Sequence, residues 1–142
     1  MAKLAIDAKQ FKNLLETTKR FNKCLKAINL VELGKGRCTA TLKVKEEHTN
    51  SMGTMQAGFA ASLVDTISSH ALFTHEKGNH PSVSVNINVS YLKGIKEGEE
   101  ILIEADTLKV GKTMAFLQVL IKNKINGNLL VKGEHTMFLL QK

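Results

Sequence analysis

The chain has 142 residues, of which 43% are hydrophobic and 23% charged, with a formal net charge of +7 at pH 7. A chain of this length forms one compact domain, and we expect residues 1–142 to be that domain. No apolar run reaches the roughly 18 residues that a membrane-spanning helix needs, so no transmembrane segment is expected. With one Tyr and no Trp to stack on bases, the scattered lysines do not indicate nucleic-acid binding.

The N-terminal run MAKLAIDAKQFKNLLETTKRFNK mixes apolar residues with lysines and contains no continuous apolar segment or small-residue cleavage site. We therefore expect no secretory signal and a cytoplasmic protein, with mitochondrial import as the alternative that a basic, amphipathic start leaves open. Cys24 and Cys38 form no CxxC motif, which is typical of reduced thiols. No histidine pair has metal-binding spacing, so no metal is expected.

The first predicted element is an amphipathic helix over 7–22, whose apolar face carries Phe11, Leu14, Leu15, Thr18 and Phe21. Two strands follow, at 25–33 and 37–45, joined by the turn signal Gly34-Lys35-Gly36. A polar loop over 46–54 then leads into residues 57–74, which are apolar around most of a helical circumference. A helix of that kind is buried.

From Pro81 onward the apolar period changes to two, which predicts a strand in which Val83, Val85, Ile87, Val89 and Tyr91 alternate with polar residues. Three more strands are predicted at 100–109, 113–123 and 128–140, the last two joined through Asn126-Gly127. Those two strands are apolar on both faces for part of their length, which favours pairing with another subunit. The order of elements predicts an α+β fold, with a mostly antiparallel six-stranded sheet curled around the long helix.

Asp65 is the first candidate for chemistry, because it is the only carboxylate between Glu47 and Glu76 and lies on the apolar helix. The alternative is that Asp65 merely lies on a polar, solvent-facing stripe of the helix with Ser62, Thr66 and Ser69. The run Gly53 to Gly58 ends at the N-terminus of the same helix, where free backbone N–H groups could hold an oxyanion. The alternative there is that the glycines only permit tight turns.

Other residues give weaker signals. Asn50 could simply stabilise its own turn. Gly111-Lys112-Thr113 ends like a phosphate-binding loop, but a strand follows it, so it is predicted to be a turn. No GxSxG motif is present, and no serine is tied to a histidine and an acid by a familiar spacing, so a Ser-His-Asp mechanism is not supported.

Three segments carry a family resemblance: HTNSMGTMQAGFAASLVDTISS at 48–69, SVSVNINVSYLK at 82–93 and LKVGKTMAF at 108–116. Together they resemble the small hotdog-fold acyl-CoA thioesterases, and the likeness covers nearly the whole chain. The resemblance implies a hotdog fold and a homotetramer, built as a dimer of dimers with active sites at subunit interfaces. It also implies hydrolysis of medium- to long-chain acyl-CoA with no cofactor beyond the coenzyme A of the substrate.

The resemblance assigns roles residue by residue. Asp65 corresponds to the family's base or nucleophile, Asn50 to the asparagine that positions water, and Ser84 to a serine near that water and the substrate. The family's His-Gly-Gly is replaced by Gln56-Ala57-Gly58. Alanine keeps the N–H of the oxyanion donor, and Gln56 can donate a hydrogen bond but cannot carry a proton at neutral pH.

The family's coenzyme A contacts correspond to the stretches from Tyr91 to Lys96 and from Lys109 to Met114. The residues implied to bind substrate there are Tyr91, Lys93, Lys96, Lys109 and Lys112, although any one lysine could equally be a solvated turn residue. Two other functions stay open. The Gln56-Ala57 change could leave a non-catalytic acyl-CoA-binding or protein-interaction module, whereas another hotdog reaction such as dehydration would need a catalytic histidine that this motif lacks.

Overall fold

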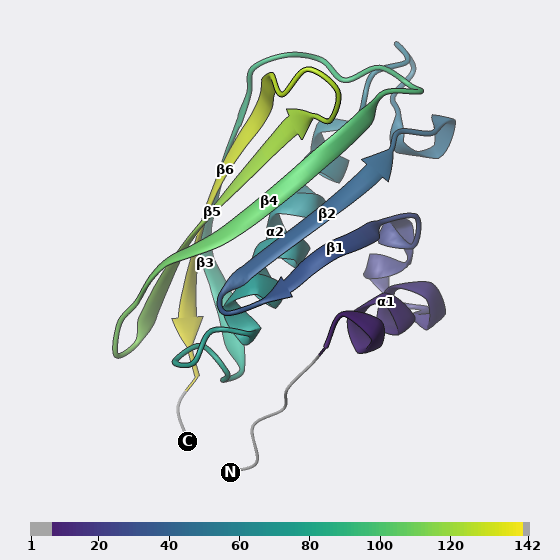
Figure 1. The fold of residues 1–142 in the computed structure, drawn as a ribbon. Coiled ribbons are helices and arrows are strands. Elements are labelled where there is room, and N and C mark those ends of the chain that lie inside the picture. The colour runs from purple at the N-terminus through teal and green to yellow at the C-terminus, as the bar shows by residue number, and fades with distance from the viewer. Residues whose placement is uncertain (1–6, 141–142) are drawn as a thin grey trace.

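The structure is a computed structural model that describes residues 7–140, so the first part of the basic N-terminal run, residues 1–6, lies outside the described residues. Six antiparallel strands form one sheet in the order β1-β2-β4-β5-β6-β3, and the sheet curls around helix α2 (Figure 1). The elements are α1 (Ala8–Thr17), η1 (Phe21–Leu25), β1 (Asn29–Gly34), β2 (Arg37–Lys43), η2 (Glu46–His48), α2 (Ala57–Phe73), β3 (Ser82–Tyr91), β4 (Glu100–Val110), β5 (Met114–Asn123) and β6 (Leu129–Leu139). This is the predicted hotdog arrangement.

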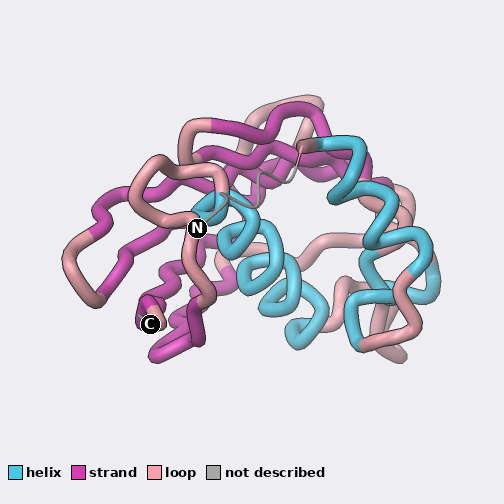
Figure 2. The backbone as a smooth tube through the Cα atoms, turned by 90° about the horizontal axis from the view of Figure 1, so that it is seen from below, coloured by secondary structure: helices cyan, strands magenta, loops and turns pink. Residues whose placement is uncertain are grey.

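Helix α2 fills the concave side of the sheet. Its buried residues include Leu63, Val64 and Ile67, and they face the inward side chains of the strands, such as Ile103 on β4 and Val119 on β5. Figure 2 shows α2 enclosed by the arch of strands, with the N-terminal helices beside it. A helix that is apolar nearly all round is thus covered on most sides, as the sequence predicted. No helix among residues 7–140 is long and apolar enough to cross a membrane.

The N-terminal helix is shorter than predicted. Phe11 and Leu15 are buried as expected, but α1 ends at Thr17 because Thr18 is extended, with φ −65° and ψ 139°. Thr17 and Thr18 are both β-branched, and such residues favour helix less than most others. The Thr17 hydroxyl also donates a hydrogen bond to the carbonyl of Asn13, a contact that slightly destabilises a helix. The chain continues as η1. Leu14 and Phe21, which the helical spacing assigned to the buried face, are 49% and 73% exposed.

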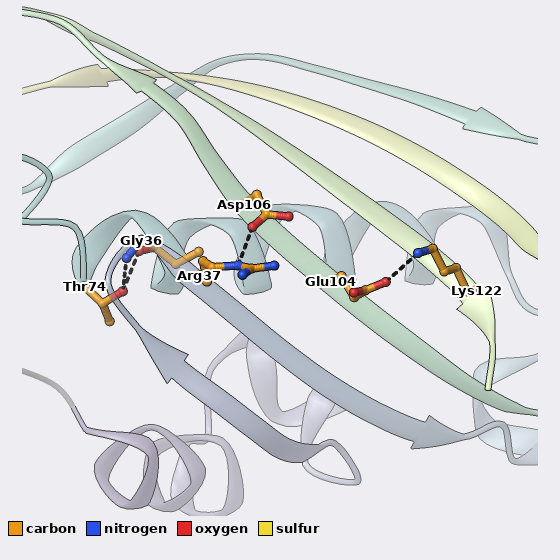
Figure 3. A network of polar contacts seen from close by, with 7 residues as sticks. Gly36, Arg37, Thr74, Glu104, Asp106 and Lys122 are labelled. Atoms are coloured by element: carbon orange, nitrogen blue, oxygen red, sulfur yellow. Dashed lines mark hydrogen bonds and ion pairs between the residues drawn. The ribbon is translucent and has the colours of Figure 1, made fainter. Parts of the chain in front are cut away.

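Polar contacts fix the sheet and the end of α2 (Figure 3). The β1–β2 turn places Lys35 at φ 51° and Gly36 at φ 80°, the two positive values that a type I′ hairpin turn requires. Thr74 then accepts a hydrogen bond from the Gly36 N–H at 2.9 Å, which ties the C-terminus of α2 to that turn. On the convex face, ion pairs of 2.7 Å and 2.8 Å join β2 to β4 through Arg37 and Asp106, and β4 to β5 through Glu104 and Lys122.

Candidate active site

The N-terminus of α2 is open. Gln56 occupies the N-cap with an extended backbone, and its side chain makes no capping hydrogen bond. Gln56, Ala57 and Gly58 are all exposed. The first helical N–H groups have no intrahelical partner, and the helix dipole gives them a partial positive charge. This end of α2 therefore presents unpaired N–H donors, among them that of Ala57, whose role as oxyanion donor stays a prediction.

Asn50 lies in the loop just before this helix, and its side chain holds the loop in shape. Its Oδ1 accepts from the backbone N–H of Met52 at 2.9 Å, and its Nδ2 donates to the Thr54 hydroxyl at 3.0 Å. The turn-forming role considered from the sequence is thus observed. It does not exclude a second role, because the amide Nδ2 carries two hydrogens and one stays available to a substrate or water.

His48 fastens the same loop to α2. Its side chain is 2% exposed, its Nδ1 accepts from the Lys45 N–H at 3.0 Å, and its ring stacks on Phe59 at a centroid distance of 4.6 Å. Burial lowers the pKa of His48, although the neighbouring Glu47 carboxylate acts in the opposite direction. A neutral ring is the form that can accept the Lys45 hydrogen bond. His48 thereby positions Asn50 next to the open helix end.

A cleft of about 260 Å³ lies at this end of α2. The Tyr91 hydroxyl donates to the carbonyl of Ala57 at 2.8 Å and so joins the end of β3 to the first turn of the helix. Lys93 lines the cleft, and Lys96 follows in the same segment. The lining residues are mostly apolar: Met55, Ala57, Ala60, Tyr91, Leu92, Lys93, Gly94, Ile95 and Val131. We call Asn50, Gln56, Ala57, Tyr91 and Lys93 the donor half-site.

Asp65 lies farther along α2. It is half-buried on a stripe with Ser62 and Ser69, whereas Thr66, which the sequence also placed there, is buried. No described residue donates a hydrogen bond to its carboxylate, which leaves the carboxylate oxygens available to water or substrate. Its negative charge raises the pKa of His135, but burial is the larger effect and lowers that pKa overall.

Ser84 reaches the same region because of a β-bulge. Simple alternation would put Ser84 and Ile87 on opposite faces of β3, but the pairing with β6 shifts between Ser84 and Asn86. Ser84 is consequently paired with Met137 and Ile87 with His135, both inward-facing residues of β6. A bulge adds one residue to a strand and re-aims the side chains beyond it. We call Asp65, Ser68, Ser84 and His135 the acid half-site.

His135 and Ser68 are site residues that the sequence analysis did not identify. His135 is 1% exposed; its Nδ1 lies 2.7 Å from the Ser68 hydroxyl and its Nε2 lies 2.7 Å from the Ser84 hydroxyl. A Ser–His contact therefore exists, although no sequence spacing indicated one. The available signal was a histidine at an inward position of an otherwise apolar strand face.

The two half-sites are separated within one chain. Ala57 and Asp65 are eight residues apart on α2, which corresponds to about 12 Å along the helix axis at 1.5 Å per residue. Lys109 and Lys112 are also separated from the donor half-site. Their β4–β5 turn adjoins the C-terminal end of β6, where the Leu139 N–H donates to the carbonyl of Thr113 at 2.7 Å, whereas Tyr91 pairs with Val131 near the other end of β6. The structure thus gathers Asn50, Gln56, Ala57, Tyr91 and Lys93 at one end, and places Lys96 nearby. It does not bring Asp65, Ser84, Lys109 or Lys112 to that end.

Neither cysteine belongs to a half-site. Both are free thiols, and Cys24 is exposed whereas Cys38 is buried on β2. Burial, with a smaller contribution from the Glu32 charge, raises the pKa of Cys38 to about 12. A thiol with that pKa is almost never ionised at neutral pH and is a poor nucleophile.

The sheet, its central helix and the open helix end define a hotdog-fold protein, and comparison with known proteins gives its family. A model of the thioesterase superfamily matches residues 52–129. Human acyl-coenzyme A thioesterase 13 is 45% identical over 121 residues, which cover 85% of this chain and 86% of the human protein. The crystal structures of thioesterase superfamily member 2 from zebrafish and mouse have TM-scores of 0.90 and 0.86, each with 37% identity, and the match covers 96% of this chain and 100% of theirs. The chain belongs to the thioesterase superfamily, which confirms the expectation of a thioesterase at the level of the family.

Proposed function

We propose that the protein hydrolyses medium- to long-chain acyl-CoA to a free fatty acid and coenzyme A. The observation that carries the proposal is the pair of half-sites, one with unpaired N–H donors beside an apolar cleft and the other with an available carboxylate. These are the two components that thioester hydrolysis requires, since the carbonyl oxygen must be stabilised as charge develops and water must be activated. The relatives named acyl-coenzyme A thioesterase 13 support the same reaction.

The half-sites would meet across a dimer interface. β3 is an edge strand of the sheet, and its exposed apolar residues include Val83, Val85 and Tyr91. If β3 pairs with its copy about a two-fold axis through its centre, the Tyr91 end of one strand lies beside the Ser82 end of the other. Each donor half-site would then face the acid half-site of the partner. The free edge would also be covered, as sheet edges commonly are.

In this arrangement the roles are distributed between two subunits. The Ala57 N–H of one subunit polarises the thioester carbonyl, and Asn50 helps to hold the attacking water. Asp65 of the partner subunit, in its ionised form, takes a proton as the water oxygen attacks the carbonyl carbon. Collapse of the tetrahedral intermediate breaks the C–S bond, and the thiolate leaves as coenzyme A with that proton. The exposed side chain of Gln56 supplies a further hydrogen-bond donor at the helix end.

The charges suit a ligand with several phosphates. Lys93 and Lys96 lie at the donor half-site, and the same two-fold axis would bring the β4–β5 turn of the partner subunit, with Lys109 and Lys112, toward that end. The resulting group of lysines would attract the phosphates of coenzyme A, while the apolar cleft would receive the less polar part of the substrate.

A second contact would complete the tetramer. The convex face is charged over β2 and β4 but apolar near the ends of β5 and β6, where Phe116 is 42% exposed and Phe138 is 39% exposed. Two large aromatic side chains on a sheet face are well suited to self-association. We propose that dimers associate through this region into a dimer of dimers.

The test combines turnover, a variant and oligomeric state. Purified protein should hydrolyse members of an acyl-CoA panel of increasing chain length, and light scattering should report a tetramer. Asp65→Asn keeps the shape but removes the charge, so kcat should fall by roughly 10² to 10⁴ in a folded oligomer. Binding of acyl-CoA without turnover would instead support the non-catalytic module. An Asp65→Asn oligomer with wild-type kcat would refute the role of Asp65.

A further inference from the structure

A continuous line of hydrogen bonds connects three elements through His135. The imidazole, on β6, lies between the Ser68 hydroxyl of α2 and the Ser84 hydroxyl of β3, with both heavy-atom distances at 2.7 Å. Ser68 and His135 are buried, whereas Ser84 is exposed. The line therefore runs from the protein interior to a surface group.

The hydrogens along this line can be counted. The Ser68 oxygen is 2.5 Å from the carbonyl oxygen of Val64, one turn earlier in α2. A carbonyl only accepts, so the single hydroxyl hydrogen of Ser68 is directed to Val64. Ser68 must then accept from His135, which places a hydrogen on Nδ1.

The position of the hydrogen between His135 and Ser84 follows from the charge of the ring. Burial lowers the pKa of His135, with the Asp65 charge opposing that effect, so the ring is neutral near pH 7. A neutral imidazole carries one N–H, and with Nδ1 protonated its Nε2 is an acceptor. The Ser84 hydroxyl consequently donates its only hydrogen to Nε2.

We infer that Ser68 and His135 are positioning residues that hold Ser84 as a hydrogen-bond acceptor toward the attacking water. This inference rests on the proposed hydrolase function. A water bound to Ser84 must donate a hydrogen to it, and a second hydrogen can go to the Asp65 carboxylate. The water oxygen has two lone pairs: one can accept a hydrogen bond from Asn50 of the partner subunit, and the other is left for the thioester carbon. With the opposite tautomer, Ser84 would be free to donate to the water and would occupy the lone pair that attacks.

The tautomer is measured directly by NMR of the oligomer labelled with ¹⁵N-histidine, using long-range ¹H–¹⁵N correlations at pH 7.5. The His135 signals are assigned by their loss in His135→Asn. We expect a protonated Nδ1 and an unprotonated Nε2. A ring protonated on Nε2, or on both nitrogens, overturns the inference. This readout does not require activity, so it remains decisive even if the wild-type protein hydrolyses no acyl-CoA, an outcome that would reject the proposed function alone.

Kinetics of Ser68→Ala test the consequence for catalysis. The variant removes the acceptor that fixes Nδ1–H, so kcat should fall roughly 10- to 100-fold with KM within about twofold, as expected for misplacement of a reacting group. Ser68→Thr retains the hydroxyl and should recover most of the activity. Ser62→Ala is the matched control, because the Ser62 hydroxyl makes the same bond to its own i−4 carbonyl, at 2.8 Å, without a histidine. A folded Ser68→Ala oligomer with wild-type kcat, or an equal loss in Ser62→Ala, would contradict the inference.

Discussion

Ala57 differs from the glycine of the family motif by one methyl group, but the atom that matters for an oxyanion is its backbone nitrogen. Ala57→Pro removes this N–H and little else. Proline is favoured at the first position of a helix, and Gln56 already has the extended conformation, with ψ 129°, that a residue before proline adopts. We expect kcat for acyl-CoA to fall roughly 10²- to 10³-fold, the usual cost of losing one oxyanion donor, with little change in the free energy of unfolding.

Ala57→Gly is the control for this substitution, because it restores the family residue and keeps the N–H. Its kcat should equal or exceed that of the wild-type protein, since removing the methyl group gives the thioester more room. If a folded Ala57→Pro variant turns over acyl-CoA as fast as Ala57→Gly, the carbonyl oxygen is held by other donors.

Individual residues were predictable where their chemistry contrasts with the local sequence. Asp65 is conspicuous because it is charged within an apolar helix, and Ala57 because it begins that helix. His135 contrasts with the apolar face of its strand, but this did not identify its partners, because Ser68 and Ser84 lie 67 and 51 residues away in the sequence. A hydrogen-bonded group of this kind exists only after tertiary packing, so spacing along the chain could not reveal it.

The same limit applies to whole elements. The period-two pattern predicted β3 and its bounds, but not the bulge that turns Ser84 inward, because an extra residue leaves no mark in the alternation of polar and apolar residues. The close approach of α2 to β6 could not be predicted from the sequence either. A Cβ atom at Gly133 would lie only 2.7 Å from the Val64 side chain, so glycine permits the spacing at which Ser68 reaches His135. By contrast, the buried character of α2 was evident from composition alone.

The contact between α1 and α2 should make stability depend on pH. Phe11 stacks on His70 at a centroid distance of 3.6 Å, and the His70 Nδ1 donates to the carbonyl of Thr66 at 2.9 Å. Burial lowers the pKa of His70 below its ordinary value of 6.5, and the bond to Thr66 only partly offsets this. As the pH falls through 6.5, His70 is protonated in the unfolded chain before it is protonated in the folded protein. The free energy of unfolding should therefore decrease between about pH 7 and pH 5.

Urea unfolding at several pH values and one fixed protein concentration measures this effect. Burial also lowers the pKa of His48 and His135, so they contribute in the same direction, and His70→Gln should reduce the slope without abolishing it. A wild-type stability that stays constant or rises on acidification would show that these buried rings do not control it.

At the scale of the whole molecule, the net charge of +7 includes lysines that the proposed function assigns to the coenzyme A phosphates. Double charge reversal, Lys109→Glu with Lys112→Glu, should raise KM for acyl-CoA roughly fivefold or more and change kcat little, because a remote phosphate contact stabilises ground and transition states alike. The effect should weaken at high salt. Lys43→Glu, on the convex face of β2, is the control. An unchanged KM in the double variant would mean that these lysines do not contact the phosphates.

The residue pattern predicted assembly, and the family resemblance implied that the active sites lie at subunit interfaces. Apolar residues on both faces of 113–123 and 128–140 predicted a partner, and the spacing of Ala57 and Asp65 on the predicted helix already corresponds to about 12 Å. The fold adds the partners of these two residues: Tyr91 bonds to Ala57, whereas His135 and Ser84 lie at the acid half-site. That separation is the reason for the central claim, which is that one active site uses Ala57 of one subunit and Asp65 of another.

Complementation between two inactive variants tests this claim most directly. Asp65→Asn and Ala57→Pro are co-expressed in equal amounts, and the activity of the mixed oligomers is compared with that of each variant alone. If the site is shared, half of the interfaces are mixed and each has one intact site of two, so activity should recover to about a quarter of the wild-type value. If both residues of a site come from one chain, every site carries a defect, and activity no greater than that of the separate variants would contradict the shared active site.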